Sequence, residues 1–343
     1  MKVALLDKPF SFVIKEEDKP RIGATEVLVK VVACGVCGTD VRAWEGKQPR
    51  TWTITYPYRM GHELAGVVEE VGEDVPDLKR GDRVVSDGRM VCGRCHYCRR
   101  GLYNLCMNQS YISGGFSEYA AYPYRNLVKI PDGVSLEHAT LTEPLACCIN
   151  GNSKLDIPLG GVAVVIGDGP IGLLHAQLLK GEGMSVIMAG HHDHRLAVAK
   201  ALGVHVTVNA KKQDPMGSVR ELTDGRGADV VVSAAGEDVS VLAQAIEIAA
   251  KGGQILYFAA TREDQVTLDL DTIHYHELRL IGSHDSTIAH YEMALALLKS
   301  GAVQAGPLIS HRFPLEQIGK AFEVARNREG IKVLIKHREE DWG

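Results

Sequence analysis

Hydrophobic and polar positions in the middle of the chain form a regular series of short apolar runs and longer mixed segments. The apolar runs have the length of strands, and the mixed segments have the length of helices. The pattern predicts strands at Val162–Ile166, Ser185–Ala189, Asp229–Ser233 and Gln254–Ala259, and helices at Ile171–Lys180, Arg195–Leu202 and Val241–Ala250. This alternation predicts an α/β domain in which helices cover both faces of a parallel sheet.

The segments on either side have a different pattern. β-Branched runs bounded by glycine or charge indicate a largely β region before residue 145, and helices return only near the C-terminus. Strands are predicted at Val27–Val32, Ala65–Val71, Val84–Ser86 and Lys332–Ile335, and helices near Tyr291–Ser300 and Gln317–Arg326. The change of pattern near Leu145 and the length of 343 residues indicate two domains.

The composition narrows the class of protein. Hydrophobic residues make up 45% of the chain and charged residues 24%, as in an ordinary globular enzyme. The formal net charge of −5 argues against nucleic acid or an anionic membrane as a partner. Met1–Phe10 does not form a signal segment, and apolar runs such as Val162–Ile166 are too short to cross a bilayer. We therefore expect a cytoplasmic enzyme with a small-molecule substrate.

Four of the eight cysteines are clustered as Cys92-x2-Cys95-x2-Cys98-x7-Cys106. Disulfides are possible, but this clustered spacing in a long chain without secretory features is typical of metal binding. Four thiolates form a closed tetrahedral shell, so we predict a structural zinc that holds a small lobe at about residues 90–108. An iron–sulfur site fits less well, because that motif has its last cysteine sooner and followed by proline, whereas Met107 follows here.

A glycine-rich loop follows the first strand of the α/β region. Val162–Ile166 leads directly into Gly167-Asp-Gly169-Pro170-Ile171-Gly172, which opens a predicted helix. In this context the motif indicates a dinucleotide site rather than an ordinary turn. Gly167 would make the tight turn, Gly169 would let a pyrophosphate approach, and Gly172 would allow close helix packing.

The next strand ends without the acidic residue that NAD enzymes usually carry there. Gly190 is followed by His191, His192, Asp193, His194 and Arg195. A missing acid with basic neighbours favours the 2′-phosphate of NADP, with contacts from Gly190, His191, His192 and Arg195. The alternative is NAD, with Asp193 holding the ribose hydroxyls.

A second metal group is indicated less strongly. Cys37 lies in Cys37-Gly-Thr39-Asp40, and His62 is followed by Glu63. Neither pair is diagnostic alone, because lone cysteines and histidines are usually structural. Cys34 and Cys37 could form a redox pair, but no thioredoxin-like βαβ unit surrounds them. We therefore expect Cys34 to be a small core residue.

These motifs together resemble the zinc-containing medium-chain dehydrogenase/reductase family, and especially its sorbitol/polyol dehydrogenase branch. The resemblance follows family order over nearly the whole chain, which is more specific than any single motif. The matching segments are CGVCGTD at 34–40, GHELAGVVEEVG at 61–72, GDRV at 81–84, CGRCHYCRRGLYNLC at 92–106, GGFSEY at 114–119, EPLA at 143–146, VIGDGPIGLL at 165–174 and KVLIK at 332–336. The resemblance implies a GroES-like domain from residues 1–146 and 286–343 and a Rossmann domain from 147–285.

The resemblance also assigns roles to individual residues. It implies a catalytic zinc held by Cys37, His62, Glu63 and Glu143, with the two carboxylates bound directly or through water. It makes Thr39 the acceptor of the substrate proton and Asp40 the hydrogen-bond partner that orients His62.

Three further positions are expected to contact cofactor or substrate. Family members often carry histidine where this chain has Arg42, and an arginine cannot relay a proton. We expect the proton to leave through the cofactor ribose and water, and Arg42 to contact a cofactor phosphate. By analogy, Trp44 and the loop from Trp52 to Arg59 line the substrate cleft, although Trp44 could equally be a packed surface between the domains.

The implied activity is hydride transfer between a secondary alcohol of a polyol, sugar or cyclitol and NAD(P), with two zinc ions per chain. A threonine-dehydrogenase-like or simple alcohol dehydrogenase of the same fold is the alternative. A non-zinc reductase is disfavoured because all four ligand positions are filled, and a nucleic-acid-binding zinc ribbon is disfavoured by the acidic chain. The resemblance also suggests a homotetramer or homodimer.

Overall fold

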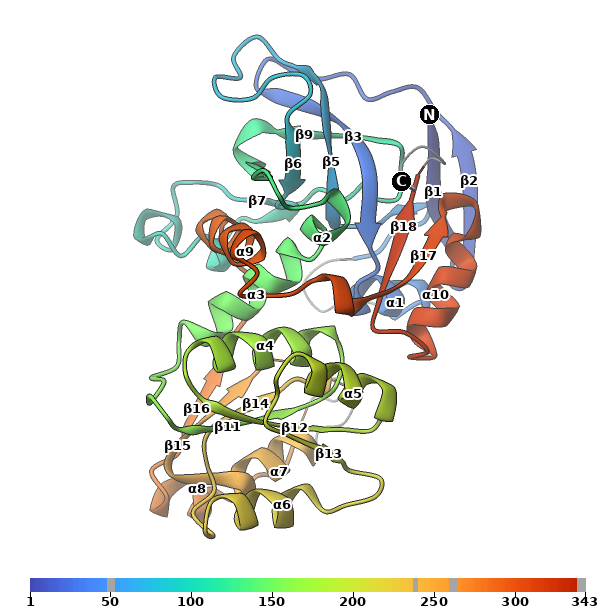
Figure 1. Cartoon of the computed structure of the whole chain (residues 1–343). Helices are drawn as coiled ribbons and strands as arrows, with labels where there is room; N and C mark the ends of the chain where they lie inside the picture. Colours follow the sequence, from blue (N-terminus) through green and yellow to red (C-terminus); the bar gives the residue numbers. More distant parts are fainter. Residues whose placement is uncertain (48–52, 237–239, 259–264, 338–343) are drawn as a thin grey trace. The chain divides into compact units, whose positions relative to one another are not determined.

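The computed structural model describes residues 1–47, 53–236, 240–258 and 265–337, and the chain divides into two compact units (Figure 1). The first unit contains Met1–Pro144, Ser286–Gly301 and Ala305–Gly343. The second unit contains Leu145–Asp285 and Ala302–Gln304. The domain boundaries expected after residues 146 and 285 lie beside this division, and the three residues 302–304 were not expected in the second unit.

The second unit is built on a six-stranded parallel sheet with the strand order β13–β12–β11–β14–β15–β16. Its elements are β11 (Val162–Ile166), α4 (Pro170–Gly181), β12 (Ser185–Gly190), α5 (Asp193–Ala201), β13 (Val206–Asn209), α6 (Pro215–Leu222), β14 (Ala228–Ser233), α7 (Ser240–Ile248), β15 (Ala249–Tyr257), α8 (Leu270–Tyr275) and β16 (Arg279–Gly282). Helices α4 and α5 cover one face, and α6, α7 and α8 cover the other (Figure 1). Buried valines and isoleucines of the central strands form the core. The predicted parallel sheet is confirmed.

The first unit is mainly β. Its largest sheet has the order β10–β6–β5–β3–β18–β17, with β9 also paired to β3, and smaller sheets join β2–β1–β4 and β7–β8. Its strands are β1 (Lys2–Lys8), β2 (Ser11–Glu16), β3 (Glu26–Gly35), β4 (Tyr58–Arg59), β5 (Glu63–Val71), β6 (Arg83–Ser86), β7 (Arg89–Met90), β8 (Ser110–Tyr111), β9 (Tyr119–Pro123), β10 (Leu127–Lys129), β17 (Ile309–Pro314) and β18 (Lys332–Lys336). Its helices are α1 (Gly38–Trp44), α2 (Leu136–Ala139), α9 (Ile288–Ser300) and α10 (Ile318–Arg326), while α3 (Thr142–Asn152) contains the boundary between the units.

The return of the C-terminal segment to the first unit places residues that are far apart in sequence side by side. Strand β18 pairs antiparallel with β3, with Leu334 opposite Gly35, and the Val36 N–H donates to the Val333 carbonyl. Strand β5 pairs with β3 on the other side, with Glu63 also opposite Gly35. The end of β3, the start of β5 and the middle of β18 therefore meet around Gly35, next to the Cys37 segment.

Two sequence predictions need correction at their ends. The helix predicted at Val241–Ala250 stops at Ile248, because Ala249 and Ala250 begin β15 and Ala249 pairs with Ala228 of β14. The strand predicted to reach Ala259 ends at Tyr257, and Ala259 lies outside the described residues. Within the described ranges, no helix combines the length and apolarity needed to cross a membrane.

Candidate metal and nucleotide sites

Cys37 is fixed at the beginning of helix α1. It is the N-cap residue, with an extended backbone at φ −86° and ψ 154°, and its sulfur accepts the Thr39 N–H at 3.5 Å. The Asp40 carboxylate accepts the Cys37 N–H in return, at 3.1 Å. This reciprocal capping by residues 37–40 holds the sulfur in one place.

His62 and Glu63 reach the same place from the start of β5. Gly61 turns the chain with φ 87°, and a Cβ there would lie 2.9 Å from the backbone nitrogen of Phe116, so glycine is required. Asp40 Oδ1 accepts the Gly61 N–H at 3.4 Å and lies 3.6 Å from His62 Nδ1. The structure therefore brings Asp40 and His62 together, as expected for a carboxylate that orients the imidazole.

The three side chains converge in a position that attracts a cation. One donor atom from each of Cys37, His62 and Glu63 lies within 4.8 Å of the others. Burial opposes a positive charge on His62, but the nearby Asp40 carboxylate and Cys37 sulfur outweigh it, so the pKa of His62 is raised well above its usual value. Sulfur, imidazole nitrogen and carboxylate oxygen are the ligands of zinc in proteins, so this donor set fits a zinc ion.

A buried lysine that was not predicted completes the charge balance. Lys332, at the start of β18, forms an ion pair with Glu63, and both side chains are at most 3% exposed. Its Nζ also donates to the Val36 carbonyl at 3.2 Å. Burial lowers the pKa of Lys332, but Glu63 and Cys37 outweigh this and raise it. The sequence signal was a lysine at each end of the apolar run Val333–Ile335, in a strand that is buried throughout.

Glu143 lies outside the group of three. It is half-buried in the first turn of α3, and its charge adds to those that raise the pKa of Lys332. The negative charge of Glu143 therefore acts on Lys332, as the charges of Glu63 and Cys37 do. Its role as a fourth zinc ligand stays a prediction.

Thr39 and Arg42 lie on helix α1, Thr39 in its first turn and Arg42 in its last. Both are half-buried, and Thr39 lies two residues from Cys37. Their roles in proton transfer and phosphate binding stay predictions.

The structure does not support the expected substrate contacts. Trp44 is 4% exposed and packs edge-on against Phe10, with ring centroids 4.8 Å apart, so it is a core residue and not part of a cleft. Arg59 is exposed on β4 and forms an ion pair with Glu17 at the surface. Trp52, where the expected substrate loop begins, lies outside the described residues.

The four clustered cysteines also converge. The sulfurs of Cys92, Cys95, Cys98 and Cys106 lie within 4.8 Å of one another. Backbone N–H groups of Cys92 and Asn108 donate to the Cys106 sulfur at 3.3 and 3.4 Å. Four sulfurs fill a tetrahedral shell, so the group fits a structural zinc with no open position.

Two of these thiols have pKa values shifted in opposite directions. Backbone N–H groups of Cys98 and Met107 lower the pKa of Cys95 to about 6. Burial and the neighbouring thiols of Cys95 and Cys106 raise the pKa of Cys98 to about 12. Adjacent thiols resist carrying several negative charges unless a cation balances them, which again favours a bound metal ion.

The glycine-rich loop has the form required of a phosphate-binding turn. Gly167 has φ 123°, and a Cβ on Gly172 would lie 1.9 Å from the Gly167 carbonyl oxygen, so both positions require glycine. Gly169 is the N-cap of α4 and has no atom within 4 Å of its Cβ position. Pro170 and Ile171 begin the helix. The open space at Gly169, in front of the helix N-terminus, fits a pyrophosphate.

The basic residues that follow β12 contact Asp168, a residue to which the sequence analysis gave no role. The backbone N–H groups of His191 and His192 both donate to Asp168 Oδ2, at 2.7 Å. Arg195 is buried, with its Nη1 3.6 Å from Asp168 Oδ1. Sequence reasoning treated Asp168 only as the variable position of the glycine motif, and nothing in its local sequence shows that it meets the segment after Gly190.

The comparisons with known proteins agree with the fold and the candidate sites described above. The family model of the alcohol dehydrogenase GroES-like domain matches residues 23–132, and that of the zinc-binding dehydrogenase matches residues 170–300. A sorbitol dehydrogenase from Halalkalibacterium halodurans is 35% identical over 94% of this chain and 95% of its own. An L-threonine 3-dehydrogenase from Bacillus subtilis is also 35% identical, over 96% of both chains.

Solved structures with bound nucleotide are similar over the whole chain. A zinc-binding dehydrogenase from Sinorhizobium meliloti 1021, bound to NADP, has a TM-score of 0.89 and 31% identity, with 98% of each chain covered. A protein from E. coli CFT073 named as a short chain alcohol dehydrogenase, complexed with NADH, has a TM-score of 0.89 and 30% identity, with 98% of this chain and 99% of the other covered. The similarity confirms the predicted GroES-like and Rossmann fold.

Proposed function

Because the chain belongs to the zinc-binding dehydrogenase family with an alcohol dehydrogenase GroES-like domain, we propose that it interconverts a secondary alcohol and a ketone with a nicotinamide dinucleotide. The alcohol belongs to a polyol, a sugar or a cyclitol. The observation that carries the proposal is the convergence of Cys37, His62 and Glu63 in the first unit. The glycine-rich loop at 167–172 supports the cofactor.

Oxidation of an alcohol removes a hydride from carbon and a proton from the hydroxyl. When bound, zinc supplies a Lewis acid that makes the hydroxyl more acidic, and the nicotinamide accepts the hydride. In the proposal, Cys37, His62 and Glu63 bind the metal, with Glu143 as a further ligand, and Asp40 keeps the His62 ring oriented. Thr39 accepts the hydroxyl proton while it passes its own hydroxyl proton on toward water. Arg42 stays charged and binds a cofactor phosphate instead of relaying that proton.

The substrate class rests on two features of the chain. The family resemblance places Glu143-Pro-Leu where simple alcohol dehydrogenases carry a cysteine ligand, which favours a polyol. A sorbitol dehydrogenase is among the relatives at 35% identity. L-Threonine is the second candidate, because an L-threonine 3-dehydrogenase is equally similar.

A substrate panel with matched variants tests the proposal. The purified chain is assayed with sugar alcohols, cyclitols, L-threonine and primary alcohols, with NAD and NADP in parallel, and its zinc content is measured. We expect two zinc ions per chain and oxidation of at least one polyol. Cys37→Ala should retain one zinc ion and lose activity. The control Cys34→Ala, three residues away in the core, should retain both zinc ions. Full activity of Cys37→Ala would refute the metal assignment.

The same proposal includes a cytoplasmic location and a homodimer or homotetramer. All eight cysteines are free thiols, as zinc binding requires, and reduced thiols are typical of the cytoplasm. The structural-zinc lobe carries exposed apolar side chains that suit contact between copies of the chain, namely Leu102, Tyr103, Leu105 and Met107. Sedimentation analysis of the wild type and of Met107→Glu would test whether this lobe joins the copies.

A further inference from the structure

Strand β12 ends without an acidic side chain, and Asp168 of the glycine-rich loop places a carboxylate at that position instead. A Cβ built on Gly190 would lie 2.5 Å from both Cβ and Oδ2 of Asp168. The Asp168 side chain therefore occupies the space that a side chain at position 190 would need. In NAD enzymes that strand-end position usually carries the acid that binds the ribose hydroxyls.

Asp168 is firmly held in this space. Its Oδ2 accepts two backbone N–H groups, and the His192 ring nitrogen Nδ1 lies 3.1 Å from both carboxylate oxygens. Burial acts to raise the pKa of Asp168, but the hydrogen bonds from the side chain and backbone of His192 and from the His191 backbone outweigh it and lower the pKa. The group is therefore a carboxylate at neutral pH.

Asp168 also changes what Arg195 can do. The two side chains are each 7% exposed, and the guanidinium lies 3.6 Å from Asp168 Oδ1. A buried arginine that faces a carboxylate has its charge balanced already. It offers much less attraction to a 2′-phosphate than the sequence suggests, and the carboxylate itself would repel that group.

A ribose hydroxyl has the opposite relation to this carboxylate. The two backbone N–H groups occupy Oδ2, so a ribose hydroxyl would donate to Oδ1, the oxygen that faces the His192 ring and the Arg195 guanidinium. NAD presents a 2′-hydroxyl at the place where NADP presents a phosphate.

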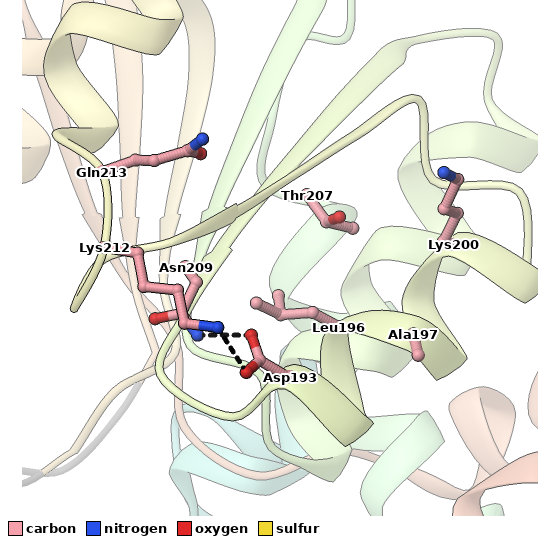
Figure 2. Close-up of a pocket in the computed structure, with 8 residues that line it drawn as sticks. All are labelled: Asp193, Leu196, Ala197, Lys200, Thr207, Asn209, Lys212 and Gln213. Atoms are coloured by element: carbon pink, nitrogen blue, oxygen red, sulfur yellow. Dashed lines mark hydrogen bonds and ion pairs between the residues drawn. The ribbon is translucent and has the colours of Figure 1, made fainter.

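The other acid in this segment is engaged elsewhere. Figure 2 shows Asp193 in a pocket beside α5 and β13, where its carboxylate accepts hydrogen bonds from Asn209 at 2.6 Å and Lys212 at 2.7 Å. Asp193 is exposed, whereas the backbone N–H groups of His191 and His192 donate to Asp168. Asp193 is therefore a suitable control for the effect of a nearby negative charge.

We propose that Asp168 is the specificity-determining acid of the nucleotide site and that it makes the protein prefer NAD over NADP. The proposal rests on the proposed function only in so far as the chain binds a nicotinamide dinucleotide. It reverses the preference for NADP that Gly190 and its basic neighbours suggest when the sequence is considered alone.

Equilibrium binding of NADH and NADPH to the full chain, followed by nucleotide fluorescence, tests the proposal without any substrate. We expect the wild type to bind NADH at least about tenfold more tightly than NADPH. Asp168→Asn keeps an acceptor for the loop and removes the charge, and it should shift this ratio toward NADPH by about ten- to a hundredfold. Asp193→Asn should leave the ratio unchanged.

Moving the carboxylate from position 168 to position 190 tests whether the acid itself, and not the structure of the glycine-rich loop, determines the preference between NADH and NADPH. The double variant Asp168→Gly, Gly190→Asp moves the carboxylate to the strand end and should restore the preference for NADH. Thermal melting of each variant shows whether it is folded. Equal or tighter binding of NADPH by the wild type would overturn the proposal, as would an unchanged ratio in folded Asp168→Asn. If neither nucleotide bound to the wild type, the proposed function would fail as well, so the two failures are distinguishable.

Discussion

Replacing Lys332 by methionine removes a cation from the interior of the first unit and leaves the Glu63 carboxylate without it. The side chains of Lys332 and Glu63 are 3% and 1% exposed, so water cannot compensate. Removal of one partner from such a buried pair typically costs about 3–5 kcal/mol of unfolding free energy. Methionine has nearly the same shape as the lysine stem, so little of this cost arises from a cavity.

The metal gives this prediction a second, independent test. A cation bound by Cys37, His62 and Glu63 would balance part of the charge that Lys332 leaves behind. We therefore expect Lys332→Met to be destabilised by about 3–5 kcal/mol in the zinc-free protein and by clearly less in the zinc-loaded protein. Adding Glu63→Gln to the zinc-free variant removes the unbalanced charge and should recover most of the loss.

Urea titration followed by tryptophan fluorescence suits the measurement, because Trp44 is a core residue of the first unit. The experiment is performed near neutral pH, with and without a chelator. Since Glu63 and Cys37 raise the pKa of Lys332 despite its burial, the stabilisation by the pair is fully present there and is lost only as the pH rises through that raised value. Equal midpoints for Lys332→Met and wild type, or no recovery with Glu63→Gln, would refute the reasoning.

Two further predictions concern the structural lobe and the second unit. Cys98→Ser should lower the zinc content by one ion per chain and lower the melting temperature, because three sulfurs no longer close the shell; an unchanged zinc content would contradict the assignment. His175 is fully buried, and burial lowers its pKa to about 3, so its stabilising contribution is present above the unfolded-state pKa and is lost as the pH falls toward 3. Between pH 7 and pH 5 the wild type should lose about 2 kcal/mol more stability than His175→Gln, as measured by urea unfolding followed by circular dichroism.

Most of the fold was predictable because its signals are local. The runs at β11, β12 and β14 are continuous and apolar, since both faces of a parallel sheet are buried, and their predicted bounds differ from the structure by one residue or none. The edge strands β13 and β16 were missed because each has only four residues and is partly exposed, so neither forms an apolar run. The end of helix α7 was misplaced because two alanines favour a helix, whereas pairing with β14 makes them part of a strand.

The four-cysteine cluster could be predicted as a zinc site from its spacing alone, whereas Cys37, His62 and Glu63 were assigned as zinc ligands only through the family resemblance, because neither pair is diagnostic alone. The sequence left Trp44 open between a substrate cleft and a packed surface, because an aromatic residue near a motif looks the same in both, and its packing on Phe10 favours the packed position. Lys332 was missed because its partner Glu63 is 269 positions earlier in the chain and they meet only through the pairing of β18 and β5 with β3.

The nucleotide site shows how such distant pairs can also change a conclusion about function. Asp168 and Gly190 are neighbours only because β11 and β12 pair in parallel, which brings the loop after each strand to the same edge of the sheet. The side chain at one position excludes a side chain at the other, since a Cβ on Gly190 would overlap the Asp168 carboxylate. A glycine at the strand end therefore means a missing acid only when the glycine-rich loop supplies none. The charge that faces the ribose is a property of the two loops together, and the choice between NAD and NADP has to be inferred from both.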